Sequence, residues 1–318
     1  MKKILIAITL LATIGNISAQ TTEAEKNLKA QSKDTLDGWK VGGIASLNLT
    51  QTSLTNWSAG GQNSVSATGI LSLFANLKKG KSTWDNSLDL AYGLLQQGSE
   101  DVRKTDDKID FTSKYGQKAF KNWYYAGLIN FKSQMTAGYN YPDDSTKISN
   151  FLAPGYLLGA IGMDYKPNDI FTLFISPLTM KMTIVNDQNL ADIGAYGVDP
   201  AEFDLVTGTL IKNGLTTRTE YGGYLRVLFK KDVMKNINLQ SKLELFSNYE
   251  EATHVDVNWE VLIAMKVNKY ISATISTQLL YDHDIDIALD RNNDGIIDGS
   301  GKRVQFKEVL GIGIAYKF

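Results

Sequence analysis

The chain has 318 residues, with no cysteine, 27 glycines, 5 prolines and a formal net charge of −1. The absence of cysteine excludes disulfides, thiol catalysis, thiolate zinc sites and a lipid-modified cysteine anchor, and the near-neutral charge offers no basic face for nucleic acid. The mean hydropathy of −0.18 is that of a soluble protein, but it also suits a membrane barrel, because half of each strand faces a polar lumen.

The N-terminus has the parts of a secretory signal peptide. Lys2 and Lys3 precede an apolar stretch that is too short to span a membrane, and Ala19 offers a cleavage point. We therefore expect residues 1–19 to be removed on export. Residues 20–37 are polar and lack aromatic side chains, so we expect a short periplasmic lead-in there.

The rest of the chain alternates apolar and polar residues with a period of two. In the clearest segment, 254–267, Val257, Trp259 and Val261 share one face, and Asp256 and Glu260 lie on the other. A helix cannot produce alternation of this length, so the pattern predicts β-strands. About twelve strands follow from it, near 38–51, 62–78, 81–97, 104–117, 122–138, 155–166, 170–186, 216–230, 236–249, 254–267, 270–285 and 303–318.

The lengths of the strands and connections indicate a membrane barrel. The strands exceed the roughly 5–6 residues usual in soluble sheets and satisfy the roughly 9–11 residues that a tilted membrane strand needs. Short turns alternate with longer connections, as outer-membrane barrels require. The longest connections are 139–154, 186–215 and 286–302. Pro177 interrupts one strand, and the pattern of apolar residues changes parity there, which predicts a β-bulge.

The last strand carries an insertion signature. Leu310, Ile312, Ile314 and Tyr316 share a face with the terminal Phe318. An alternating strand that ends in an aromatic residue is typical of barrels inserted into the outer membrane by the barrel-assembly machinery. Outer-membrane lipid and that machinery are therefore the expected partners.

These patterns predict one all-β domain over residues 38–318. In lipid every backbone N–H and C=O must be paired within the protein, and an exported chain without apolar helices meets that demand only by closing its sheet. Closure also removes exposed strand edges. We expect an antiparallel up-and-down transmembrane β-barrel of about 12 strands.

The expected lumen lining is polar and of mixed charge. Two interpretations compete: the charges pair across the lumen and plug it, or they line a narrow polar channel. Neither sign dominates, so no ion selectivity is assigned, and a plugged or nearly plugged lumen is the expectation. The predicted lumen-lining charges are Asp85, Asp89, Lys132, Arg218, Glu220, Arg226, Lys242, Glu244, Asp256, Glu260 and Lys266.

One loop resembles half of a calcium site. Oxygen ligands at alternate positions could surround one cation, and Gly295 permits the sharp turn that such a loop needs. The twelfth position of an EF-hand loop is Gly301 instead of glutamate, so the alternative is a solvated Asp/Asn/Gly hairpin. No cofactor is required, and calcium is the only candidate. The candidate ligands are Asp290, Asn292, Asp294, Ile296 and Asp298.

Two further features of the sequence bear on function. Trp57, in a glycine-containing loop, is expected to pack on the barrel rim, with contact to a partner or glycan as the alternative. The chain has only 2 histidines, and no serine motif accompanies His254 or His283, so we expect no enzymatic activity.

Four segments resemble a family of bacterial outer-membrane proteins known only as domain of unknown function 3078. They are Ser53-Leu54-Thr55-Asn56-Trp57-Ser58-Ala59-Gly60-Gly61-Gln62-Asn63, Ile175-Ser176-Pro177-Leu178-Thr179-Met180-Lys181, Gly194-Ala195-Tyr196-Gly197-Val198-Asp199-Pro200 and the closing strand 306–318. The resemblance implies a barrel in the cell envelope. It implies no activity and no site residues.

The sequence therefore predicts a non-enzymatic outer-membrane protein, structural or an accessory subunit of an envelope complex. A narrow, porin-like channel for small polar solutes is the alternative, and a barrel hydrolase is the least favoured hypothesis.

Overall fold

The computed structural model describes residues 37–55, 62–141, 143–168, 170–268, 271–289 and 299–317. The predicted signal peptide 1–19, nearly all of the predicted lead-in, Trp57 and Phe318 lie outside the described residues.

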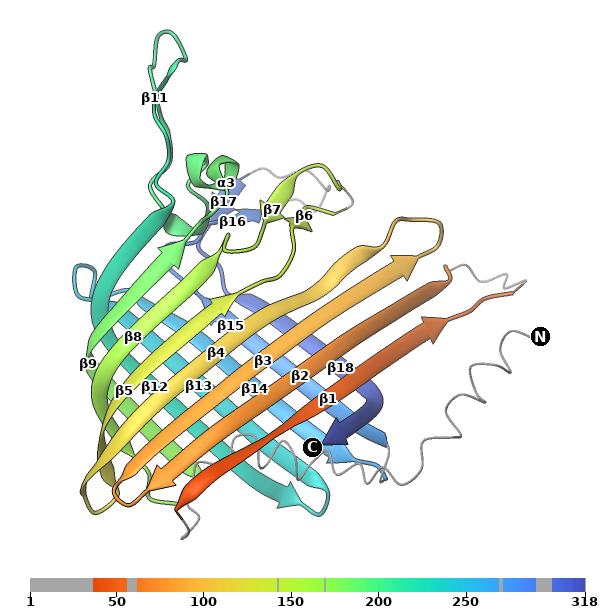
Figure 1. Ribbon diagram of the computed structural model, residues 1–318. Helices are drawn as coiled ribbons and strands as arrows, with labels where there is room; N and C mark the ends of the chain where they lie inside the picture. Colours follow the sequence, from red (N-terminus) through yellow and green to blue (C-terminus); the bar gives the residue numbers. More distant parts are fainter. Residues whose placement is uncertain are drawn as a thin grey trace.

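Within the described residues, twelve long antiparallel strands close into one barrel (Figure 1). Each strand pairs with its neighbours along the chain, and β1 pairs with β18 to close the sheet, with Leu47 opposite Ile314. The predicted fold class and strand number are confirmed. The barrel strands are β1 Gly38–Thr52, β2 Ser64–Lys79, β3 Ser82–Gln97, β4 Arg103–Phe120, β5 Trp123–Ser133, β8 Gly155–Tyr165, β9 Phe171–Ile184, β12 Thr217–Met234, β13 Ile237–Asn248, β14 Val255–Lys266, β15 Ile271–Tyr281 and β18 Gln305–Lys317.

The outer wall of the barrel is apolar and the inner wall is polar. Outward side chains such as Val41, Ile161 and Ile312 are 69%, 64% and 62% exposed, whereas inward Asp110 and Asn130 are buried. Aromatic rings gather at the short-turn end, where the tilted rings of Trp39 and Trp84 lie 5.8 Å apart between their centroids. An apolar outer band bordered by aromatic residues is the surface of a barrel that crosses a membrane.

The two ends of the barrel differ. The connections at one end are tight, for example between β2 and β3, whereas the opposite end carries long loops with short elements that form a cap (Figure 1). Among the described residues no helix is long and apolar enough to cross a membrane. The cap elements are β6 Gly138–Tyr139, β7 Lys147–Ser149, α3 Gln188–Asp192, η2 Ala195–Gly197, β16 Ile287–Leu289 and β17 Gly299–Gly301, and a hairpin of β10 Glu202–Phe203 and β11 Leu210–Lys212 projects beyond them.

A β-bulge in β9 is found where Pro177 predicts it. Ile161 pairs with Leu178 but Met163 pairs with Ile175, so β9 has one extra residue against β8. The Ser176 hydroxyl donates to the Ile161 carbonyl at 2.8 Å and thereby satisfies a backbone acceptor beside the bulge. A side chain at Gly162 would collide with the Ile175 carbonyl, so glycine is needed opposite the bulge.

The cap has a small core and an ionic anchor. Val185, Leu190 and Val198 are buried together, and Lys147 of β7 binds Asp187 at 2.9 Å. The hydrogen bond from Lys147 lowers the pKa of Asp187, and the same bond raises the pKa of Lys147.

We expect this anchor to make the cap sensitive to acid. A carboxyl group whose pKa is depressed on folding contributes stability above its unfolded pKa, about 3.9, and that stability is lost as the pH falls through its folded pKa. Protease cleavage within 185–216 should therefore increase at and below about pH 4. In Asp187→Ala it should already be high at pH 7. If the wild-type protein and Asp187→Ala were cleaved at the same rate at every pH, the role of the Lys147–Asp187 pair as an anchor of the cap would be contradicted.

Candidate functional site

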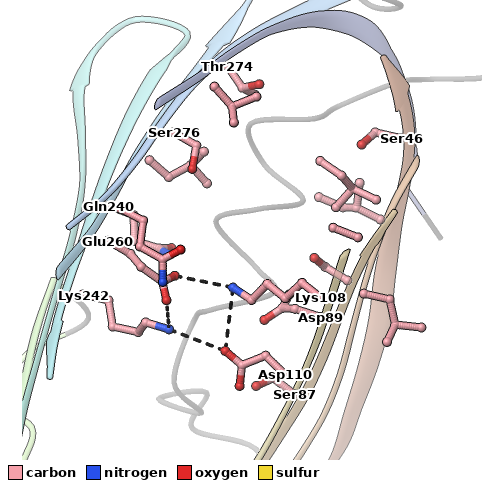
Figure 2. A pocket seen from close by; sticks show the side chains of 18 of the residues that line it. Ser46, Ser87, Asp89, Lys108, Asp110, Gln240, Lys242, Glu260, Thr274 and Ser276 are labelled. Carbon is pink, nitrogen blue, oxygen red and sulfur yellow. Dashed lines mark ion pairs between the residues drawn. The ribbon is translucent and has the colours of Figure 1, made fainter. Parts of the chain in front are cut away.

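A ring of four charges crosses the barrel lumen. Lys108 and Asp110 of β4 face Lys242 of β13 and Glu260 of β14, and Figure 2 shows the four side chains meeting inside the barrel. The Lys242–Glu260 pair is 2.9 Å long, and the other three sides of the ring are 3.7, 3.7 and 3.8 Å. Charges alternate around the ring, so its formal net charge is zero. We call these four residues the charged partition.

The partition divides the lumen into two halves. In the closed barrel, β4 and β14 have five strands between them on either side. On one side lie β5, β8, β9, β12 and β13, and on the other β3, β2, β1, β18 and β15. The two halves are filled differently.

The half enclosed by β5, β8, β9, β12 and β13 is packed. Leu128, Phe174 and Phe246 form its apolar core, together with the ring of Tyr224, which meets Phe174 edge-on. These side chains fill the lumen at the level of the cluster.

Glu244 is the centre of a buried network beside that core. Lys132 donates to it at 2.8 Å, the Tyr224 hydroxyl donates at 2.8 Å, and Asn258 donates at 3.0 Å. Arg226 lies 3.6 Å away. The carboxylate side chain is 8% exposed, so its charge depends on these partners instead of on water.

A cavity of about 420 Å³ lies mainly in the other half of the lumen and also touches Phe174, Arg226 and Leu228 of the packed half. The charged partition forms one wall of it. The facing wall consists mainly of small hydroxyl and amide side chains, several of which are visible in Figure 2. These side chains are Ser46, Asn48, Thr50, Ser66, Thr68, Ser72, Ser87, Ser272, Thr274, Ser276 and Gln278.

The cavity is elongated along the barrel. Its lining follows β2 from Ser66, near the cap, to Asn76, near the short turns. At about 3.3 Å per residue this is roughly 33 Å along the strand. With a tilt of about 40° it corresponds to roughly 25 Å along the barrel axis, which is the height of the apolar band of an outer-membrane barrel.

Charged side chains also pair at both ends of the lumen. Near the short turns, Lys166 binds Asp85 and Asp164 at 3.1 Å each. Near the cap, Lys307 of β18 binds Asp106 of β4 at 2.7 Å and reaches over the sector of β1, β2 and β3. Both ends of the lumen are therefore narrowed by ion pairs.

The predicted lumen charges lie in several groups. Lys242 and Glu260 belong to the partition, Asp89 lines the cavity, and Lys132, Arg226 and Glu244 form the network of the packed half. Asp85 belongs to the group near the short turns. Near the cap, Lys181 joins Glu220 and Asp256, and Arg218 bridges Glu220 and Asp284. Lys266, at the end of β14, is only partly buried.

The two histidines lie together beneath the cap. The rings of His254 and His283 stack with 3.5 Å between their centroids. Glu251 is the hydrogen-bond partner of the His254 ring at 2.9 Å, and the Tyr281 hydroxyl is the partner of the His283 ring at 3.2 Å. Neither of these ring partners is a serine.

The predicted calcium half-loop lies outside the described residues. Its candidate ligands are Asp290, Asn292, Asp294, Ile296 and Asp298. In the part of the chain that the structure describes, no group of three or more His, Cys, Asp or Glu side chains is arranged to hold a metal ion. Calcium binding therefore stays a prediction.

The hydroxyl wall is the feature that sequence reasoning missed. Its signal is present in the sequence, because inward positions such as Ser46, Ser66 and Ser276 carry small uncharged polar groups. The predicted lumen residues are all charged, and none of them lies in β1, β2 or β15. The alternation of side chains with a period of two identifies which positions face inward. It does not reveal which of the inward positions border empty space.

The family resemblance is confirmed over part of the chain. Residues 49–139 match a family described as "Protein of unknown function (DUF3078)". This region contains the first of the four segments on which the resemblance rests, and the other three lie beyond the match. A search of curated proteins finds no match to the chain.

Solved structures similar to this chain are outer-membrane barrels. An outer membrane channel from Pseudomonas putida F1 is 11% identical, with a TM-score of 0.40, over 91% of this chain and 98% of that chain. The translocator domain of autotransporter NalP from Neisseria meningitidis is 12% identical, with a TM-score of 0.36, over 96% and 100%. The outer membrane phospholipase of Salmonella typhi is 13% identical, with a TM-score of 0.35, over 92% and 96%. The likeness extends to the barrel fold and no further.

Proposed function

We propose that this chain, which contains a DUF3078 segment at residues 49–139, is an outer-membrane barrel through which small neutral polar solutes pass. The observation that supports this proposal most directly is the elongated cavity of about 420 Å³ beside the charged partition. Its length matches the membrane span, and its wall offers hydrogen-bond donors and acceptors along the path.

The charges of the lumen favour neutral solutes. Each lysine of the partition already has two carboxylate neighbours within 3.8 Å, and Lys307 and Asp106 are paired with each other. Because most of the charges that line the cavity are already paired within the protein, an ion there would lose water for little compensating charge. A neutral polyol or sugar-like solute loses less on dehydration and can exchange hydrogen bonds with the hydroxyl wall.

Swelling of proteoliposomes tests this proposal. Liposomes that contain the purified, heat-modifiable protein should swell in small neutral polyols, swell more slowly in larger sugars, and gain no advantage from a charged solute of equal size. Swelling no faster than that of protein-free liposomes, with folded protein present, would refute solute passage.

One projecting element favours a second function, that of an accessory subunit of an envelope complex. The β10–β11 hairpin extends away from the cap (Figure 1). Leu205 and Val206 near its tip are 102% and 93% exposed, and Ile211 is 65% exposed. Apolar side chains this exposed on a projecting hairpin suit burial against a partner protein.

Removing the apolar tip should separate the two functions. In Leu205→Ser/Val206→Ser we expect any partner that is cross-linked to the wild-type protein in intact cells to be lost, because the apolar contact area is lost. Solute passage should be unchanged, since the hairpin lies outside the lumen. If the cross-linked partner were still recovered with the double variant, the hairpin tip would not be the docking site.

The proposal includes export and assembly, and it assigns no enzymatic activity. The signal peptide 1–19 would direct secretion, and the barrel-assembly machinery would insert the chain into the outer membrane. N-terminal sequencing of the protein from outer-membrane fractions should begin at Gln20, and recovery of the uncleaved chain would contradict this part.

A further inference from the structure

A groove opens on the outside of the barrel, in the wall made by β3, β4, β5, β8, β9 and β12. Two adjacent rows of outward residues form it, each row following the strand register. One row runs Ser113, Ile129, Gly159, Met180, Tyr221, and the other runs Trp84, Tyr115, Gly127, Ile161, Leu178.

Two glycines hollow the groove. A side chain at Gly127 or at Gly159 would meet no atom within 4 Å. The neighbours in the same rows are large and project outward: Tyr115, Ile129 and Ile161 are 51%, 54% and 64% exposed. The resulting groove has a volume of about 850 Å³, within the range of about 300–1,000 Å³ typical of small-ligand sites.

The groove has little to offer a polar ligand. No charged residue lines it, and its polar groups on β3 and β4 are bonded within the protein. The Trp84 indole donates to Ser113 at 2.9 Å, and the Ser113 hydroxyl donates to Asn86 at 2.7 Å. Its contacts are therefore mainly apolar.

We propose that this groove binds one acyl chain of a membrane lipid. The groove is continuous with the apolar outer band that contacts the bilayer, so lipid is the solvent at this wall. Within a bilayer, apolar groups associate through packing instead of through exclusion of water. An unfilled groove would forfeit dispersion contacts with its lining, and a single slender chain lying across the tilted strands restores them. The inference rests on the membrane location of the barrel and not on solute passage.

A photoactivatable lipid tests the site. The protein is reconstituted in phosphatidylethanolamine vesicles that contain a fraction of phosphatidylethanolamine with a diazirine in one acyl chain, and labelled peptides are identified after irradiation. We expect labelling of the peptides at 113–129 and 159–180 to exceed that of the outward wall around Gly69. In Gly127→Leu/Gly159→Leu the excess should be lost.

The matched control is Gly69→Leu. Gly69 is also an outward glycine of a barrel strand with nothing within 4 Å of an added side chain, but it does not line the groove. Heat-modifiability verifies that each variant is folded, and solute-driven swelling should be unchanged in all of them. Equal labelling of both walls, or labelling that survives the double substitution, would overturn the proposal. A dimeric wild-type protein made monomeric by the same double substitution would also overturn it, in favour of an interface between copies.

Discussion

Replacing Ser72 by tryptophan should abolish solute-driven swelling of proteoliposomes. Ser72 projects from β2 into the cavity, and an indole there would obstruct the cross-section of a long, narrow space of about 420 Å³. Because the substitution fills existing space instead of displacing a packed side chain, the barrel should still form. The measurement is the initial swelling rate in a small neutral polyol, beside heat-modifiability on a gel.

The matched control is Gly69→Trp, which adds the same ring to the lipid-facing side of the same strand. Its swelling rate should equal that of the wild-type protein. Thr274 lies on β15, on another side of the cavity, and Thr274→Trp should block the passage of solutes from there. Folded Ser72→Trp and Thr274→Trp proteins that swell at the wild-type rate would show that solutes do not use this cavity.

Replacing Glu244 by alanine should lower the free energy of unfolding by about 3–5 kcal/mol, the cost typical of removing one partner from a buried ionic network. Lys132 and Arg226 would keep their charges without the carboxylate that lies 2.8 and 3.6 Å from them. Tyr224, 6% exposed, would also lose the acceptor of its hydroxyl. Equilibrium urea unfolding of the reconstituted protein, followed by tryptophan fluorescence, measures the change.

Glu202→Ala provides the control for charge removal alone. Glu202 pairs with Lys212 on the projecting hairpin, where the two side chains are 60% and 55% exposed. An exposed pair contributes about 0–1 kcal/mol, so this variant should remain close to the wild-type protein. Equal stabilities of Glu244→Ala and Glu202→Ala would contradict the role given to the Glu244 network.

The fold was predictable because its main signal is local. Alternation of side chains marks each strand without knowledge of its partner, so the strand predicted at 155–166 is observed at Gly155–Tyr165. Pro177 signals the bulge for a local reason as well, since proline lacks the N–H that the ladder needs. In the barrel strands the differences are confined to strand ends, as where β4 continues to Phe120. The short elements of the cap were not predicted.

The division of the lumen was not predictable in the same way. Lys108 and Glu260 meet only because the closed barrel places β4 opposite β14, and no local pattern encodes that pairing. The packed core around Phe174 has the character of the predicted plug, and the cavity is where we propose the predicted channel. Glu244 lies in the packed half, whereas Ser72 faces the cavity.

Single-channel conductance in a planar bilayer tests the central claim, that the hydroxyl-lined half of the lumen is an open path. The purified, heat-modifiable protein should give small, discrete and reproducible steps with weak selectivity between cations and anions, because the charged partition is neutral overall. The recording is repeated with and without calcium to include the loop at 290–298. A silent bilayer containing protein that is demonstrably folded would contradict the claim, and the search for function would then move to the partner of the projecting hairpin.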